Sequence, residues 1–267
     1  MSNGHDNMSF LEHLEELRWH IIRSLIAIIS VGFVCFLMKE FIFDTIILGP
    51  KKMNFPTYTF LCQAATFIGV ETTFCGDEFP FVIQNRTMAG QFSAHVMTSI
   101  IAGFILSFPY VLYEFWKFIS PGLLAKEKAR SRGFIFISSL LFFIGVLFGY
   151  YIITPLSINF LGTYQVSNEV LNEFDLGSFI GLVRSSSLAS GIIFELPIII
   201  YFLTKAGVVT PKTLVQYRKY ALVLVLVLAA IITPPDVASQ IIVAIPIVIL
   251  YQVSIFISRI VVKNQSK

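Results

Sequence analysis

The sequence has little charge, since only 13% of its 267 residues are Asp, Glu, Lys or Arg. A soluble domain normally carries about 25%. Hydrophobic residues make up 56% of the chain, and its mean hydropathy is +0.80. The 27 Phe would promote aggregation in water, but they suit a surface that faces lipid. The composition therefore excludes an ordinary soluble domain and predicts an integral membrane protein.

The sequence also lacks the strings that mark common enzymes. It contains no Gly-x-Ser-x-Gly, no phosphate-binding loop and no His-Glu-x-x-His. Its four His and three Cys form no ligand cluster, so we expect no metal site. The first twenty residues are charged and amphipathic, which argues against a cleavable signal peptide. We predict no enzyme activity, no catalytic residue, no cofactor and no nucleic-acid partner.

Six apolar segments can cross a membrane, whose hydrocarbon core of about 30 Å requires roughly 20 residues per helix. The last two flank Pro234 and Pro235 and fall short of that length, so they should thin the bilayer or pack against partners. Thr210 and Pro211 should cap and begin the fifth helix. We predict an all-α membrane protein, a concave bundle of six transmembrane helices with two short final helices. The segments are 21–38, 92–115, 134–156, 180–203, 220–233 and 238–257.

The distribution of Lys and Arg predicts the orientation. If the amino terminus is cytoplasmic, fourteen of the 19 basic residues lie on the cytoplasmic side. Basic residues near helix ends are strongly biased to that side. Six spans then return the carboxyl terminus to it, so both termini should be cytoplasmic.

The chain reads as a single polytopic domain, 1–267, without repeats. Residues 1–20 begin with a capping box, Ser9 and Glu12, and continue as an amphipathic helix. We expect this helix to lie along the cytoplasmic surface before it turns into the first span. The segment 157–178 reads as a solvated extracytoplasmic cap.

The long extracytoplasmic loop 44–91 contains Cys62 and Cys75. An oxidising compartment would permit a disulfide between them, but two unpaired thiols are the alternative. Cys35 lies in the first span and reads as a small core residue.

Three features within the spans need a reason. Glu195 lies deep in the fourth span, two residues before Pro197, and an ionisable group there should face a cavity or a partner. Alternatively, a protonated Glu195 could bond a neighbouring helix. Arg184 lies nearer the outer end and reads as interfacial. The Gly-x-x-x-Gly strings at Gly145/Gly149 and Gly177/Gly181 predict close helix packing.

Four segments together resemble the TatC family, the multi-spanning receptor of the twin-arginine protein translocase. The resemblance covers roughly 8–260. Position 114 departs from the family, with Glu in place of the usual Gln, which should add negative charge beside the 108–130 rim. The segments are the opening SFLEHLEELRWHIIRSL, the rim FPYVLYEFWKFISPGLLAKEKAR at 108–130, the Glu-x-Pro at Glu195, and TPPDVASQIIVAIP at 233–246.

The resemblance implies a receptor for signal peptides with consecutive arginines, which helps to move folded proteins across the bacterial inner membrane. Carboxylates suit planar guanidinium groups. Glu127 could instead merely balance its basic neighbours. The implied binding residues are Glu16, Arg18, Trp116, Phe118, Leu123 and Glu127.

The implied partners are single-span subunits of the TatA/TatB type and other copies of the chain, with transport driven by the proton-motive force. Glu195, Asp236 and Gln240 should line an intramembrane partner site, although Asp236 and Gln240 could equally close the final turn. The competing functions are a proton-coupled transporter of small solutes and a membrane scaffold without a recognition role.

Overall fold

The computed structural model describes residues 10–69, 73–76, 78–119, 131–167, 169–232 and 237–265. Five helical spans in this part are long and apolar enough to cross a membrane, so the predicted all-α membrane fold is confirmed. The chain forms two compact units: Met1–Lys39 with His95–Leu140, and Glu40–Ala94 with Leu141–Lys267. The spans are His13–Leu37, Gly90–Ile119, Gly133–Thr163, Leu176–Lys205 and Gln240–Asn264.

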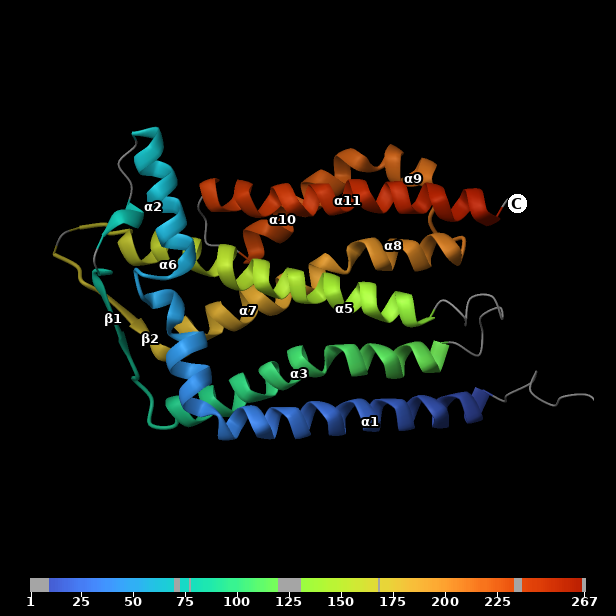
Figure 1. Ribbon diagram of the computed structural model, residues 1–267, viewed down its shortest axis with the longest axis horizontal. Helices are drawn as coiled ribbons and strands as arrows, with labels where there is room; N and C mark the ends of the chain where they lie inside the picture. Colours follow the sequence, from blue (N-terminus) through green and yellow to red (C-terminus); the bar gives the residue numbers. More distant parts are fainter. Residues whose placement is uncertain are drawn as a thin grey trace, which may run out of the picture. The chain divides into compact units, whose positions relative to one another are not determined.

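In the first unit, α1 (Phe10–Leu37) and α3 (Gly90–Ile119) run side by side (Figure 1). Their backbones meet at two glycines, because a Cβ on Gly103 would lie 2.6 Å from the carbonyl oxygen of Ile28 and 2.7 Å from Cα of Gly32. Small residues allow such close approach between membrane helices.

The predicted turn between an interfacial helix and the first span is wrong, because α1 is one continuous helix of 28 residues. Its sequence contains no Pro, and its one Gly lies at the contact with α3, so nothing ends the helix earlier. The predicted capping box lies outside the described residues for Ser9, and nothing is described of the Glu12 side chain.

In the second unit, α5 (Ser131–Phe148) continues through a π-helical turn (Gly149–Ile153) into α6 (Thr154–Thr163). A Cβ on Gly145 would lie 2.7 Å from the Ser190 carbonyl oxygen, and one on Gly149 would lie 2.7 Å from Cα of Ser187. The predicted close packing at Gly145 and Gly149 is therefore confirmed, against α7 (Leu176–Phe194). It is wrong for Gly181, whose Cβ would meet no atom within 4 Å.

The fourth span consists of α7 and α8 (Leu196–Lys205), and α8 packs along α11 (Val237–Gln265). At that contact, the buried Thr204 hydroxyl donates to the Ser258 hydroxyl at 2.9 Å. The apolar core of this unit lies between the third span and the last two helices. It comprises Ile153, Val225, Ala229, Val243, Ala244 and Ile247.

The fifth helix begins as predicted, since the backbone N–H of Thr213 donates to the Thr210 hydroxyl at 3.2 Å and Pro211 is the first helical residue. However, this helix, α9 (Pro211–Gln216), ends before Tyr217, and α10 (Arg218–Ile232) follows. At 15 residues α10 is short, about 22 Å at 1.5 Å per residue. The prediction of a short sixth helix is wrong, because α11 has 29 residues and continues through Pro246.

The two long loops are folded and paired with each other. Strand β1 (Phe81–Gln84) is parallel to β2 (Asn172–Asp175), with Phe81 opposite Asn172. The Arg86 guanidinium pairs with the Glu173 carboxylate at 3.0 Å. The reading of 157–178 as a solvated cap is wrong for its first part, because most residues of α6 are buried.

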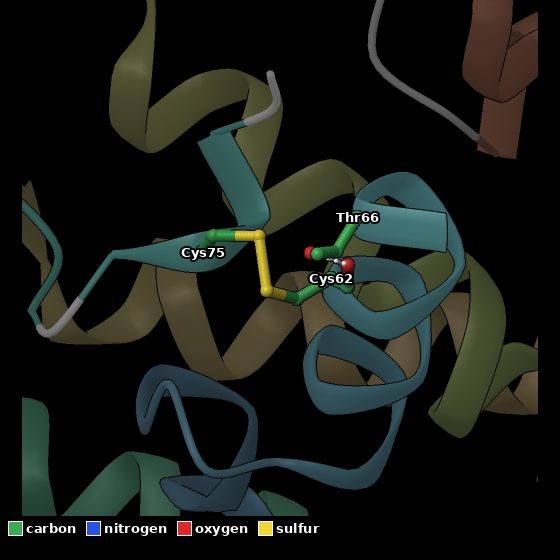
Figure 2. The surroundings of a disulfide bond; sticks show 3 residues. All are labelled: Cys62, Thr66 and Cys75. Atoms are coloured by element: carbon green, nitrogen blue, oxygen red, sulfur yellow. Dashed lines mark hydrogen bonds between the residues drawn. A yellow bond between two sulfur atoms is a disulfide. The ribbon is translucent and has the colours of Figure 1, made fainter. Parts of the chain in front are cut away.

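The first of these loops also forms short helices: a π-helical turn (Phe41–Ile47), a 3-10 turn (Gly49–Lys51), α2 (Pro56–Ile68) and a 3-10 turn (Thr73–Cys75). Of the two alternatives for the cysteines, the structure has the disulfide: Cys62 on α2 is joined to Cys75, with their Cα atoms 5.1 Å apart (Figure 2). The Thr66 hydroxyl donates to the Cys62 carbonyl at 2.8 Å. Cys35 is buried and free.

Tyr58 of α2 holds this loop to the third span. Its side chain is fully buried, and its hydroxyl lies 2.9 Å from the Pro50 carbonyl oxygen and 3.1 Å from that of Pro155. Burial raises the pKa of the Tyr58 hydroxyl. The hydroxyl therefore remains a donor throughout the physiological pH range.

Candidate functional site

The candidate site lies on the facing sides of α1 and α3 in the first unit. On α1, His13, Glu16, His20 and Arg23 recur every three or four residues, which places them along one side of the helix. On α3, Glu114 and Phe118 are four residues apart and share a face. The two helices thus present polar and aromatic side chains to each other near one end.

A buried ion pair joins the helices. Nδ1 of His20 lies 2.5 Å from Oε2 of Glu114, and the side chains are 7% and 4% exposed. Because an ionised carboxylate only accepts hydrogen bonds, Nδ1–H of His20 is the donor. Nη1 of Arg23 lies 3.8 Å from the same oxygen.

This arrangement corrects the prediction that Glu114 adds negative charge beside the rim. Its carboxylate is buried and paired with His20, and the Arg23 guanidinium further offsets its charge. Burying a carboxylate is costly unless a hydrogen-bonded cation accompanies it. Glu114 therefore joins α1 to α3 rather than charging the surface.

Phe118 is held between two imidazoles of α1. Its ring stacks on His13, with centroids 4.4 Å apart and an interplanar angle of 20°. It also meets His20 edge-on at 6.1 Å. The ring that the resemblance assigns to binding is thus fixed in place by residues around Glu16.

Glu16 is half-buried, between His13 and His20 on the same side of α1. Its Oε2 atom is inaccessible and has no hydrogen-bond partner in the described part of the chain. Buried carboxylate oxygens almost always accept hydrogen bonds, so this oxygen requires a donor from elsewhere.

The other predicted binding residues lie apart from Glu16 and Phe118 or outside the described residues. Arg18 is exposed, with its guanidinium 5.7 Å over the Trp19 ring, two residues from Glu16 and so away from its side of the helix. Trp116 is buried against Phe134 of α5, with ring centroids 4.6 Å apart, and so reads as a packing residue. Leu123 and Glu127 fall in 120–130, outside the described residues.

Sequence reasoning missed His13, His20 and Arg23 as members of this site and misjudged Glu114. A signal was present, because a carboxylate in an apolar span requires a cation nearby. His20 and Arg23 occupy the corresponding end of the first span, three residues apart. The pairing itself needed the relative rotation of the two helices, which the sequence does not give.

The second candidate site surrounds Glu195, which lies at the break between α7 and α8. The backbone N–H of Glu195 donates to the Ile192 carbonyl at 3.1 Å, a tightened turn, and Pro197 follows in the first turn of α8. The side chain is 9% exposed. The neighbouring Ile193 and Leu196 pack against the core shared with α10 and α11.

The structure brings Gln240 to α10. Its side-chain amide donates to the Leu226 carbonyl at 3.1 Å, which agrees with the alternative role of closing the final turn. Asp236 lies outside the described residues.

Comparisons with known proteins agree on one family. The family profile described as "Sec-independent protein translocase protein (TatC)" matches residues 12–246. The chain is 45% identical to a Sec-independent protein translocase protein TatC of Blattabacterium sp. subsp. Periplaneta americana, over 99% of this chain and 100% of that one. It is 34% identical to the protein of that name from Aquifex aeolicus, over 97% and 98%. The structure titled "Crystal Structure of Twin Arginine Translocase Receptor- TatC" is similar with a TM-score of 0.70 and 32% identity, covering 94% of this chain and 100% of that one.

Proposed function

The chain belongs to the TatC family of Sec-independent protein translocase proteins, and from this premise we propose that the site on α1 and α3 binds the arginine pair of a twin-arginine signal peptide. The protein is a multi-pass membrane component of the translocase and not an enzyme. The observation that carries the proposal is the inaccessible Oε2 of Glu16, which has no hydrogen-bond donor in the described part of the chain. A guanidinium of the peptide supplies such donors.

The chemistry of the site favours arginine over lysine. A guanidinium is planar, always charged and able to donate two parallel hydrogen bonds to one carboxylate. Glu16 accepts one arginine, and Glu127 is the carboxylate that the family resemblance assigns to the other. Phe118, held by His13 and His20, offers an apolar wall beside them. A lysine would keep the charge but lose the paired geometry.

The proposed partners are single-span subunits of the TatA/TatB type and other copies of this chain, with transport driven by the proton-motive force. We assign Glu195 to the docking of a polar residue from such a helix, in a hydrated pocket near the membrane midplane. In support, Glu195 lies at a helix break and next to residues that pack on the short α10. Gln240 and Asp236 would border this site.

We expect Glu195→Ala to weaken co-purification of the single-span subunits while leaving signal-peptide affinity within about twofold, because the two sites lie on different helices. A carboxylate in a span is retained only where a polar partner or water reaches it. Affinity purification from native membranes and peptide titration of the same preparation measure the two effects. Glu195→Gln keeps a hydrogen-bonding side chain and should retain part of the recruitment. Normal assembly and export by Glu195→Ala would refute the assignment.

The proposed location is the bacterial inner membrane with both termini cytoplasmic, which rests on the asymmetry of Lys and Arg. The disulfide agrees, because it places the loop after α1 on the oxidising side. Labelling of single cysteines at the two ends tests it, and a labelled carboxyl terminus outside the cell would refute it.

A further inference from the structure

Arg184 is a charged residue inside the fourth span that the proposed function does not use. It lies eight residues after Leu176, the first residue of α7, which is about 12 Å along the helix at 1.5 Å per residue. The sequence interpretation placed it at the interface, but its side chain is half-buried within the span Leu176–Lys205. A cation at such depth requires an anion, water or a polar partner.

The guanidinium has unused donors. Its Nε and Nη1 atoms are inaccessible, and neither has a hydrogen-bond partner within the described ranges. The two acidic residues just before α7 are already engaged. Asp175 accepts from the backbone N–H of Gly177 at 2.8 Å, and Glu173 pairs with Arg86.

Space lies beside Arg184 towards the start of α7. Gly181, one turn earlier on the same side of the helix, has no atom within 4 Å of an added Cβ. At Gly177, two turns earlier, such a Cβ would meet only an oxygen of Asp175, at 2.9 Å. Long side chains on a helix lean towards its amino terminus, so the guanidinium of Arg184 is directed towards this glycine-lined stretch.

We propose that Arg184 binds the phosphate of a phospholipid whose headgroup enters along the Gly177–Gly181 stretch of α7. A phosphate oxyanion accepts charge-assisted hydrogen bonds from a guanidinium, which would satisfy the unused donors. An arginine near a span end reaches towards the headgroup level while its alkyl stem remains among apolar groups. Lipid is the occupant that a span surface meets without any further protein, and its acyl chains fit the hydrocarbon depth at which the arginine begins. The inference is independent of the signal-peptide site.

The test uses the full chain in detergent, with phosphatidylglycerol as the probe and diacylglycerol of the same acyl chains as the phosphate-free comparison. Native mass spectrometry counts the lipid retained by the wild type, Arg184→Gln and Arg86→Gln. The last variant is the matched control, because it removes the same charge from an exposed arginine in the same unit.

We expect the wild type and Arg86→Gln to retain phosphatidylglycerol alike, and Arg184→Gln to bind it roughly ten- to hundredfold more weakly, as loss of charge-assisted hydrogen bonds implies. Arg184→Lys should fall between them. If Arg184→Gln does not fold, the wild type alone decides, since it must prefer phosphatidylglycerol to diacylglycerol.

Equal retention of the two lipids, or unchanged retention by Arg184→Gln, would overturn the proposal. Displacement of the lipid by millimolar inorganic phosphate would also overturn it, and would assign the site to free phosphate. If the wild type binds no phospholipid and a crosslinker at Gly181 captures only another protein, the occupant is a partner helix and not lipid.

Discussion

Replacing Glu16 and Glu127 together by Gln should abolish measurable binding of a twin-arginine signal peptide. Hydrogen bonds to charged groups contribute about 1.5–3 kcal/mol each, and every 1.4 kcal/mol is a tenfold change in affinity. Glu16→Gln alone should therefore weaken binding roughly ten- to hundredfold, and the double substitution at least about a hundredfold. Titration of a labelled peptide against the purified protein in detergent measures the loss.

Glu15→Gln is the matched control, because it removes the same charge from an exposed neighbour of Glu16 on α1. It should leave the affinity unchanged. A twin-lysine peptide should bind the wild type weakly and lose little more in Glu16→Gln, since it lacks the paired geometry. Unchanged affinity in the double substitution would remove both carboxylates from the site. Unchanged affinity in Glu127→Gln alone would support the reading in which Glu127 only balances its basic neighbours.

His20→Ala should destabilise the protein by about 3–5 kcal/mol, the usual cost of removing one partner from a buried ion pair. The substitution leaves the Glu114 carboxylate buried, with only Arg23 at 3.8 Å to offset it. It also removes one of the two imidazoles that hold Phe118, so signal-peptide affinity should fall as well. Thermal unfolding in detergent and peptide titration measure the two effects.

The double variant His20→Leu with Glu114→Leu separates charge from packing. Replacing a whole buried pair by apolar residues is often neutral or stabilising, so this variant should recover the stability that His20→Ala loses. Peptide affinity should not recover to the same extent, because the edge contact with Phe118 is changed. Wild-type stability in His20→Ala would show that the pair does not hold α1 to α3.

The sequence predicted the spans well and their contacts poorly, for a physical reason. Hydropathy reports where apolar runs begin and end, but not which sides of two helices meet. The Gly-x-x-x-Gly strings show the difference, because Gly145 and Gly149 contact α7 closely while Gly181 faces open space at the same spacing. The ion pair between His20 and Glu114 depended on the same missing rotation.

Local signals behaved in a similar way. Thr210 and Pro211 marked a helix start correctly, because a cap involves only neighbouring residues. The sixth helix was predicted to end with its apolar run, yet α11 continues through the polar residues that follow to Gln265. The strands β1 and β2 escaped prediction because four residues carry little signal and their partner lies two spans away.

The loop after α1 acquires its structure in two stages as the chain is made. Cys62 and Cys75 are separated by only 13 residues, and both precede α3, so a nascent chain holds both thiols before the second span is complete. The loop that they close is short, which keeps the entropy cost of closure low. The pairing of β1 with β2 must wait until the third span has been inserted. The covalent link thus belongs to the earliest steps of biogenesis, and a chain stalled after α5 would carry the disulfide beside a β1 strand whose partner had not been made.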